Sequence, residues 1–369
     1  SVVLFMCWPI LTPGPPRQYL HDLKNPGTIV ISVQRRKQSR PPRQRPPLTR
    51  RTPIQPTRLT PGLRPATTPT TQPTPAAQPT EAGRGGQGGA AGASYSILAA
   101  RQSTDGILPF NNKNVTDALS AAARFSNGIT EARVAARWSA SLYQYPTEFD
   151  GTVADRNAEQ VDHRLVVSAD LAHRLSTNLM VHLLLGSNEY LPRSNDGPDT
   201  PADTLGFYGY FSHSVRTRRS AEARLDYRLA DRSTFTVGGE VARDRERTSS
   251  LSLSEYGNSP DAFEAARHNS ALYAQLLGDV SSRLSYSVGA RLDQNSAFGI
   301  FRTARVSTAW AVNGTTRLRA SIGNAFKAPS FYENFATGYV TGNPALRPER
   351  SRSSEVGFER VGQDGTVAL

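Results

Sequence analysis

The sequence predicts an all-β protein: a partial transmembrane antiparallel β-barrel, preceded by a disordered segment rich in proline and arginine. Three observations lead to this fold class. Residues 94–369 consist of segments in which apolar and polar side chains alternate, the connections between these segments are short and long in turn, and residues 1–93 differ in composition from the rest. The expected organisation is a low-complexity segment at 1–93 and a partial barrel at 94–369.

The first segment is set apart by its charge and its prolines. Residues 1–90 hold 13 of the 43 Lys and Arg residues and 2 of the 31 Asp and Glu residues, so their net charge is 13 − 2 = +11 out of +12 for the chain. They also hold 17 of the 26 prolines. Such a segment buries little apolar surface and cannot sustain ladders or helices, so we expect it to be disordered or locally polyproline II.

A basic arm can bind nucleic acid, but this one lacks aromatic residues that stack on bases. No Phe, Trp or Tyr lies between Tyr19 and Tyr95, so a nucleic-acid partner is not expected. The single cysteine, Cys7, excludes an intramolecular disulfide and a cysteine-based zinc cluster. The apolar run from Val2 to Leu11 is too short to cross a bilayer as a helix.

Alternation with a period of two identifies the expected strands. In the segment 133–143, Val134, Trp138 and Leu142 fall on one face. Ser139 and its polar neighbours fall on the other face, which is typical of a half-buried strand. Similar segments are 161–174, 178–188, 205–216, 221–229, 234–244, 270–280, 284–293, 301–312, 317–323 and 353–361, with weaker ones at 95–101, 116–124 and 366–369.

The connections between the expected strands alternate in length. Short turns are expected at 126–128, 174–177, 230–233, 280–282, 313–314 and 362–365, and long polar loops at 145–160, 187–204, 246–268 and 327–352. Asn-Gly, as at Asn313 and Gly314, favours a tight hairpin because both central residues of a type I′ turn need positive φ. Tight turns on one side of a sheet and long loops on the other are typical of outer-membrane barrels.

Charged side chains recur on the polar face of these strands. In the segment 221–229, Leu225 and Tyr227 alternate with Arg224 and Asp226. Isolated buried charges cost several kcal/mol, so such a face must meet water or opposite charges. A water-filled barrel interior provides this environment while the apolar face meets lipid; a soluble sandwich with one solvated face is the alternative. The number of strands favours the barrel, because an open sheet of this size leaves exposed edges.

Two motifs near the end of the chain carry a family resemblance. The first reads Gly-x-Ala-Phe-Lys-x-Pro-Ser and the second Gly-Asn-Pro-x-Leu-x-Pro-Glu. Their residues are Gly323, Ala325, Phe326, Lys327, Pro329 and Ser330, followed by Gly342, Asn343, Pro344, Leu346, Pro348 and Glu349. This pair of motifs resembles the barrel of TonB-dependent outer-membrane receptors. Segments 103–112, 273–276 and 289–293 are similar to strands of the cobalamin-type members.

The resemblance implies a location and a function. Such receptors are barrels of about 22 strands that enclose a plug domain, lie in the bacterial outer membrane, contact its lipid, and import scarce metal chelates with energy passed on by the TonB complex. The implied ligand is cobalamin first and a ferric siderophore second. A passive porin-like barrel is the alternative, and an outer-membrane lipase is a weaker one. No covalent chemistry is expected, so the protein is not expected to be an enzyme.

Two features depart from the family pattern. The segment 1–93 matches neither the plug nor the TonB-binding box that should precede the barrel. The chain also ends at Leu369, several strands before a barrel of that size would close. We therefore expect the sequence to be a truncated piece of a receptor.

Two candidate sites have simpler interpretations. Ser126-Asn127-Gly128 resembles a motif of outer-membrane phospholipases, but Arg124 occupies the position of their catalytic histidine and cannot activate a serine. A hairpin turn is therefore the expected role, and no catalytic residue is assigned. Asp196, Asp199 and Asp203 could supply oxygen ligands to calcium, although their spacing does not follow a recognised calcium loop. No other metal or cofactor site is expected.

Overall fold

The computed structural model describes residues 80–148, 150–362 and 365–368. The interpretations of residues 1–79, including their disorder, lie outside the described residues. The described part is one sheet in which each strand pairs antiparallel with the next strand along the chain. This order confirms the all-β antiparallel fold class.

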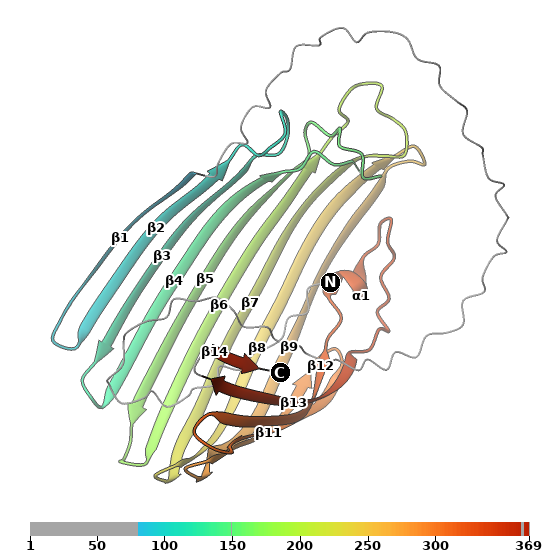
Figure 1. Ribbon diagram of the computed structural model, residues 1–369. Coiled ribbons are helices and arrows are strands. Elements are labelled where there is room, and N and C mark those ends of the chain that lie inside the picture. The colour runs from blue at the N-terminus through green and yellow to red at the C-terminus, as the bar shows by residue number, and fades with distance from the viewer. Residues whose placement is uncertain (1–79, 149, 363–364, 369) are drawn as a thin grey trace, which may run out of the picture.

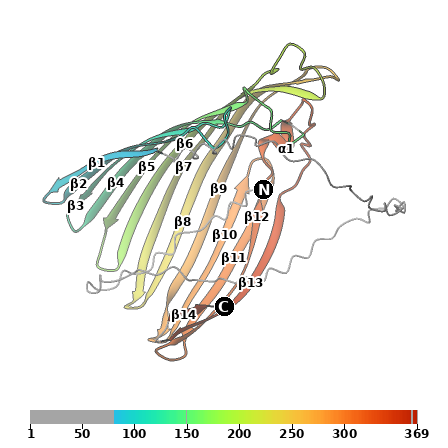
Figure 2. The ribbon, with the colours of Figure 1, turned by 45° about the horizontal axis from the view of Figure 1, so that its top comes forward.

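The sheet has 14 strands and curves into a trough, with β1 at one edge and β14 at the other (Figures 1 and 2). The strands are β1 (Thr80–Ala90), β2 (Ala93–Thr104), β3 (Asn114–Ser126), β4 (Thr130–Gln144), β5 (Glu159–Arg174), β6 (Leu179–Asp196), β7 (Phe207–Ala230), β8 (Ser233–Ser254), β9 (Ser259–Ser281), β10 (Leu284–Asn295), β11 (Gly299–Ala311), β12 (Thr316–Lys327), β13 (Glu349–Gly362) and β14 (Gly365–Ala368).

The sheet begins earlier than the sequence indicates. The boundary expected between residues 93 and 94 is wrong, because β1 starts at Thr80 and β2 at Ala93. β1 is rich in glycine, which has no side chain that could alternate between two faces, and the strand therefore shows no periodicity. Most of its glycines lie close to β2: a Cβ atom added at Gly88 would lie 2.8 Å from the hydroxyl oxygen of Tyr95.

Strands β7, β8 and β9 are the longest, with 24, 22 and 23 residues. About ten residues of a tilted strand cross the apolar layer of a bilayer, so these strands continue beyond it. Two expectations are wrong here. Residues 205–216 and 221–229 belong to one strand, and the loop expected at 246–268 is two paired strand ends joined at 255–258. Residues 243–250 of β8 are polar at every position, so the ladder continues there without apolar alternation.

The two ends of the sheet differ in their connections, as the sequence predicts. One end has tight turns, such as the β3–β4 turn in which Gly128 adopts a φ of 85°. The other end carries the long connections 145–158, 197–206 and 328–348, together with short ones at 255–258 and 296–298. The loop expected at 187–204 is wrong in its first half, because β6 continues to Asp196. The connection 328–348 contains α1 (Phe331–Phe335), the one helix among the described residues. None of the helical structure described is long and apolar enough to cross a membrane.

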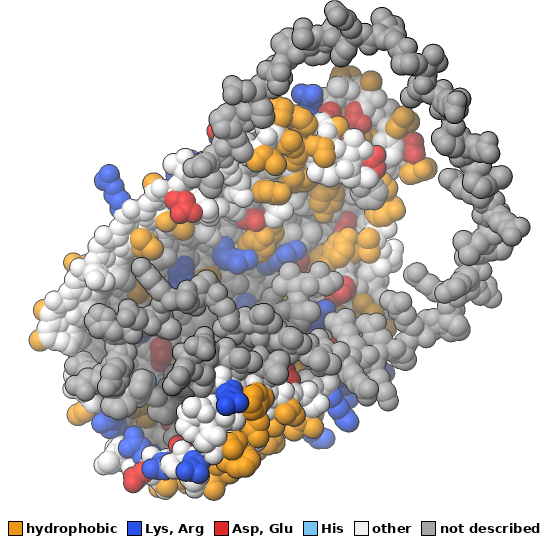
Figure 3. Space-filling view, viewed as in Figure 1, with side chains coloured by type: hydrophobic (Ala, Val, Ile, Leu, Met, Phe, Trp, Pro, Cys, Tyr) orange, Lys and Arg blue, Asp and Glu red, His pale blue; other side chains and the backbone are white. Residues whose placement is uncertain are grey.

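The two faces of the sheet have opposite character. On one face, which we call the outer face, large apolar side chains are exposed; Val134 is 52% and Val241 57% exposed. The other face, here called the inner face, lines the trough, where Lys and Arg lie near Asp and Glu (Figure 3). The outer-face apolar residues include Tyr95, Ile97, Leu119, Phe125, Val134, Trp138, Leu165, Leu171, Leu183, Leu185, Leu225, Tyr227, Phe235, Val237, Val241, Leu272, Val288, Leu292, Val306 and Ile322. We call this surface the apolar band; it is the surface that lipid covers in a transmembrane barrel.

Candidate functional site

Ion pairs that cross four strands connect the inner face of β7 to β10. Glu240 of β8 accepts hydrogen bonds from Arg218 of β7 at 3.3 Å and from Arg291 of β10 at 2.8 Å. Arg218 also donates to Asp244 at 3.1 Å, and Arg291 donates to Asp293 at 3.0 Å. We call these five residues the inner charge network. Each carboxylate lies beside at least one guanidinium, which compensates for the partial removal of these charges from water.

The pairing continues toward the loop end and into the neighbouring strands. Arg216 donates to Glu246 at 2.9 Å, and Arg267 of β9 donates to Asp244 at 3.5 Å. On the other side, His182 of β6 lies 3.1 Å from Asp226 of β7. The wall of the trough is therefore a polar surface with opposite charges in contact, as the alternation in the sequence predicts.

An aromatic residue lies within this polar wall. Tyr190 of β6 donates its hydroxyl proton to Asp162 at 3.0 Å. The guanidinium carbons of Arg164 and Arg216 lie 4.6 and 5.9 Å from the centre of its ring, one on each neighbouring strand. Tyr190 thus presents a ring flanked by two cations, an arrangement that can bind a flat or anionic ligand group.

The first family motif ends in a capped helix. Ser330 is the N-cap of α1: its hydroxyl accepts from the backbone N–H of Glu333 at 3.1 Å, and its own backbone N–H donates to the Glu333 carboxylate at 2.7 Å. This reciprocal capping box satisfies two backbone donors at the start of the helix. The Glu333 carboxylate accepts hydrogen bonds from the backbone N–H and the hydroxyl of Ser330, which favour its charged form and lower its pKa.

The second motif is held against the same helix. The backbone N–H of Asn343 donates to the carbonyl of Glu333 at 2.9 Å, and the backbone N–H of Gly342 donates to Ala336 at 2.7 Å. The side chain of Asn334 returns a bond to the carbonyl of Asn343 at 2.9 Å. A Cβ atom at Gly342 would lie 2.6 Å from backbone atoms of Asn334 and Phe335, so only glycine fits at this position. We call residues 328–348 the motif loop.

Two polar anchors attach the motif loop to β9. Arg267 donates to the carbonyl oxygen of Pro329 at 2.8 Å, and its guanidinium carbon lies 4.5 Å from the ring centre of Phe331. Asp261 accepts from the backbone N–H of Thr337 at 2.7 Å. Phe331 is buried by this packing. The loop therefore lies beside the loop end of β9 (Figures 1 and 2).

The remaining motif residues lie on or next to the strands that flank the loop. Phe326 of β12 stacks on Phe301 of β11 with ring centres 4.4 Å apart. Lys327 and Glu349 are cross-strand partners, and their charged atoms are 3.5 Å apart. Gly323 and Ala325 also lie on β12, and Pro344, Leu346 and Pro348 lie in the chain that leads to β13. The structure thus brings the two motifs together, and each has a structural role in shaping one loop.

Sequence reasoning missed the anchors Arg267, Asp261 and Thr337. Arg267 and Pro329 are 62 positions apart, and Asp261 and Thr337 are 76 positions apart. All three fall in segments that the sequence assigns to polar loops, and nothing in the local pattern distinguishes them. Only the pairing of strands reveals that the ends of β9 and the motif loop are neighbours.

The aspartates proposed as calcium ligands lie at the loop end of the sheet, beyond the apolar band. Burial raises the pKa of Asp196 to about 6, with further contributions from the nearby charges of Asp155, Asp199 and Asp203. Asp155 and Asp199 are engaged with neighbouring loop residues; Asp199 accepts from the backbone N–H of Arg156 at 3.0 Å. No group of three or more His, Cys, Asp or Glu in the described part of the chain is arranged to hold a metal ion. Calcium at these aspartates therefore stays a prediction.

The serine considered for a lipase mechanism belongs to a hairpin. Asn127 accepts from the backbone N–H of Thr130 at 2.7 Å and so closes the β3–β4 turn. Arg124 pairs with Glu131 at 2.9 Å across the same hairpin. These contacts favour the turn interpretation of this segment.

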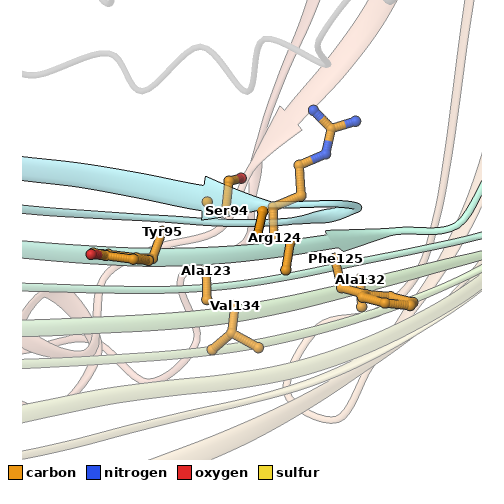
Figure 4. A pocket seen from close by; sticks show the side chains of 10 residues that line it. Ser94, Tyr95, Ala123, Arg124, Phe125, Ala132 and Val134 are labelled. Carbon is orange, nitrogen blue, oxygen red and sulfur yellow. The ribbon is translucent and has the colours of Figure 1, made fainter.

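A shallow open groove crosses β1 to β4 near these turns. It is lined by Gly89, Tyr95, Ala123, Phe125 and Val134, among others. Figure 4 shows Arg124 pointing to the opposite side of the strands from Ala123, Phe125 and Val134. Most of this lining belongs to the apolar band, so the groove belongs to the lipid-facing surface rather than to the inner wall.

Comparison with known proteins gives results that agree with this architecture. Residues 48–369 match the family model described as TonB dependent receptor-like, beta-barrel. The vitamin B12 transporter BtuB of Photobacterium profundum is 28% identical over 150 residues, which is 40% of this chain and 23% of that protein. The corresponding transporter of Vibrio vulnificus (strain YJ016) is 42% identical over 68 residues, 18% of this chain and 11% of that protein.

Solved structures show the same fold at low sequence identity. A mutant form of the ferric enterobactin receptor PfeA of Pseudomonas aeruginosa has a TM-score of 0.62 and 12% identity, covering 78% of this chain and 49% of that one. The siderophore receptor PirA of the same organism has a TM-score of 0.58 and 16% identity, covering 79% of this chain and 51% of that one. The chain thus spans about half the length of these structures and under a quarter of the curated relatives.

Proposed function

The chain belongs to the TonB-dependent receptor-like β-barrel family, and from this premise we propose that it takes part in the uptake of a metal chelate, cobalamin first and a ferric siderophore second. It is a β-barrel protein of the bacterial outer membrane, where lipid is the partner of the apolar band. The proposed partners beyond lipid are the chelate itself and the TonB complex.

The inner wall is the observation that best supports this proposal. Between Arg164 and Arg291 it presents guanidinium groups and the ring of Tyr190, which can bind the carboxylates, amides or aromatic oxygens of a metal chelate. Arg216 pairs with Glu246 yet is 46% exposed, so it retains donors toward the trough. The relatives with sequence similarity are named as vitamin B12 transporters, which favours cobalamin as the first ligand to test.

The two rival functions differ in what they require of the chain. A passive porin needs no ligand-specific wall, and its flux does not depend on the TonB complex. A lipase needs a base beside Ser126, whereas Arg124 is paired with Glu131. The proposed transport involves no covalent step; the wall and loops bind the chelate, and energy comes from outside the barrel.

An uptake assay tests the proposal. The gene that contains this sequence is expressed in a strain that lacks its own receptors for cobalamin and ferric enterobactin, with and without a functional TonB complex. We expect TonB-dependent accumulation of labelled cyanocobalamin. An Arg216→Gln variant should reduce its apparent affinity by about 10- to 150-fold, because a charged hydrogen bond contributes about 1.5–3 kcal/mol.

Arg232, in the tight β7–β8 turn, provides the matched control, and an Arg232→Gln variant should transport normally. Accumulation of ferric enterobactin instead would make the siderophore the ligand. Flux of small sugars that is indifferent to both the TonB complex and Arg216 would refute the receptor function in favour of a porin.

A further inference from the structure

Two arginines and a histidine form a row across the outer face of β7, β8 and β9 just beyond the apolar band. Arg219 of β7 lies directly opposite Arg243 of β8, and Arg243 lies directly opposite His268 of β9. All three residues are exposed. On the same face, the preceding row consists of Ala221, Val241 and their neighbours, so the change from apolar to basic occurs between adjacent rows.

This arrangement is unfavourable without an anion. Like charges directly opposite each other on neighbouring strands repel. Neither Arg219 nor Arg243 forms an ion pair or side-chain hydrogen bond with any residue that the structure describes, in contrast to Arg218 and Asp244 on the inner face of the same strand pair. Arg218 and Asp244 on the inner face thus compensate each other, whereas Arg219 and Arg243 on the outer face have no acidic partner among the described residues.

The position of the row matches the border of the hydrocarbon layer. Arg243 lies ten residues from Ser233, at the tight-turn end of β8. Ten residues at about 3.4 Å each, tilted by about 40°, rise about 26 Å. The apolar belt of outer-membrane barrels is about 25 Å tall. The Arg219–Arg243 pair therefore lies at the depth of lipid headgroups, on the side of the long loops.

Further arginines surround the pair. Arg245 and Arg247 both contact Glu264, so one carboxylate is shared between two guanidinium groups. Beyond the apolar band, the outer face of β6 to β9 carries Arg193, Arg219, Arg243, Arg245 and Arg247 against Glu189 and Glu264. We call this surface the basic patch. With five arginines and two glutamates, the basic patch has a positive net charge.

We propose that the basic patch binds the phosphate of an anionic lipid in the loop-side leaflet, with the phosphate between Arg219 and Arg243. Guanidinium groups bind phosphate oxygens through two parallel hydrogen bonds, which suits a pair of opposing arginines. The acyl chains would lie on the apolar band immediately below, along Val241, Leu185 and Leu272. This continuity of a cationic row with an apolar surface fits a lipid better than free phosphate.

Lipid titration of the full chain in a neutral detergent tests the site. The probes are lipid A with both phosphates, lipid A from which the phosphates have been removed, and inorganic phosphate, and bound lipid is measured by native mass spectrometry. Wild type should bind phosphorylated lipid A and should not lose it to inorganic phosphate. The Arg219→Gln/Arg243→Gln double variant should bind about 30-fold more weakly, equivalent to about 1 kcal/mol for each cation near a membrane surface. Arg232→Gln should bind like wild type.

A folding control separates binding from structural damage. Because the substitutions remove a repulsion, the double variant should unfold at the same or a higher temperature than wild type in lipid-free detergent, and lipid A should raise the unfolding temperature of wild type only. Equal lipid A affinity of wild type and double variant, equal binding of the dephosphorylated lipid, or displacement by inorganic phosphate would each overturn the proposal. Lower stability of the double variant without lipid would also overturn it, by showing a structural role.

Discussion

Along β7 and β8 the same strands carry two faces of opposite chemistry. On the outer face Leu225 and Val237 are partners, and both side chains are exposed. On the inner face Arg218 and Asp244 are partners, and their charged atoms are 3.1 Å apart. The same backbone hydrogen bonds hold both faces together, so the two faces differ only in their side chains. The apolar side chains suit contact with lipid, and the charged side chains suit contact with water and with one another.

The comparison shows that the two faces depend on different interactions. The outer face makes few contacts within the protein and depends on lipid to cover its apolar atoms. The inner face depends on specific partners across strands, since a charge there is tolerated because another charge compensates for it. The effect of a substitution on stability should therefore depend on the polarity of the new side chain on the outer face, and on the loss of a specific cross-strand ion pair or hydrogen bond on the inner face.

A charge placed on the outer face should have the largest effect. Val134→Arg puts a cation in the apolar band of β4, where an arginine near mid-bilayer costs about 2–4 kcal/mol. Ser139→Arg puts the same side chain on the inner face of the same strand. We expect the first variant to lose assembly into lipid vesicles, measured as protease-resistant folded protein, and the second to keep it. Similar yields from the two variants would disprove the assignment of the faces.

Crowding the motif loop on the inner side should have the next largest effect. In Gly342→Ala the new Cβ atom would lie 2.6 Å from backbone atoms of α1, and such overpacking costs about 1–3 kcal/mol. Gly314→Ala, in the β11–β12 turn, is the control because no atom lies within 4 Å of the added Cβ. Limited proteolysis should cut residues 328–348 faster in the first variant only. Equal protection in both would show that α1 and the second motif are not held together.

Removing the charge of a carboxylate that two arginines share should have a moderate effect on the stability of the inner face. Glu240→Gln weakens the bonds to both Arg218 and Arg291, and because these groups are partly exposed we expect a loss of about 1–2 kcal/mol in unfolding free energy. The control is Glu131→Gln, which breaks an exposed pair with Arg124 and should cost about 0–1 kcal/mol. Equal losses in denaturant titrations would mean that the inner charge network adds nothing beyond surface pairing.

The smallest expected effect is a pH dependence of the stability of the loops at the loop end of the sheet. Burial and neighbouring carboxylates raise the pKa of Asp196 to about 6, above its value in an unfolded chain. The neutral form therefore favours the folded loops: the stabilisation is present at low pH and is lost as the pH rises through about 6. Hydrogen exchange in residues 145–158, corrected for intrinsic rates, should be slower at pH 5 than at pH 7. Asp196→Asn should remove this difference, and its persistence in that variant would assign the effect to another group.

Much of the architecture follows from periodicity that is visible in the sequence. Val134, Trp138 and Leu142 alternate with polar residues, and this alone assigns β4 its two faces. Asn-Gly pairs locate the tight turns at 126–128 and 313–314. The positive φ expected at both central residues is wrong for these turns, because among Asn127, Gly128, Asn313 and Gly314 only Gly128 has it. The two motifs indicate the family. The alternation is informative because every second residue of a membrane-spanning strand faces the apolar part of the bilayer and is therefore apolar.

Other features could not be derived this way. The first strand, Thr80–Ala90, is rich in glycine and shows no alternation, yet it pairs along its whole length with β2. Residues 243–250 of β8 are polar on both faces, so this segment looks like part of the loop expected at 246–268 although it pairs with β9. In both cases the strand is defined by backbone hydrogen bonds to a neighbour, and backbone bonds leave no trace in the local sequence.

The sequence by itself determined which residues face lipid and which face the trough, because a period of two is a local property of an extended chain. The tertiary structure alone decided which charges meet. Arg291 reaches Glu240 across 51 positions, Arg267 reaches Pro329 across 62, and Arg219 faces Arg243 without a partner among the residues described. These contacts depend on the register in which neighbouring strands pair. The register is set by backbone hydrogen bonds, which almost any residue can form, so the local sequence does not reveal which distant side chains become neighbours.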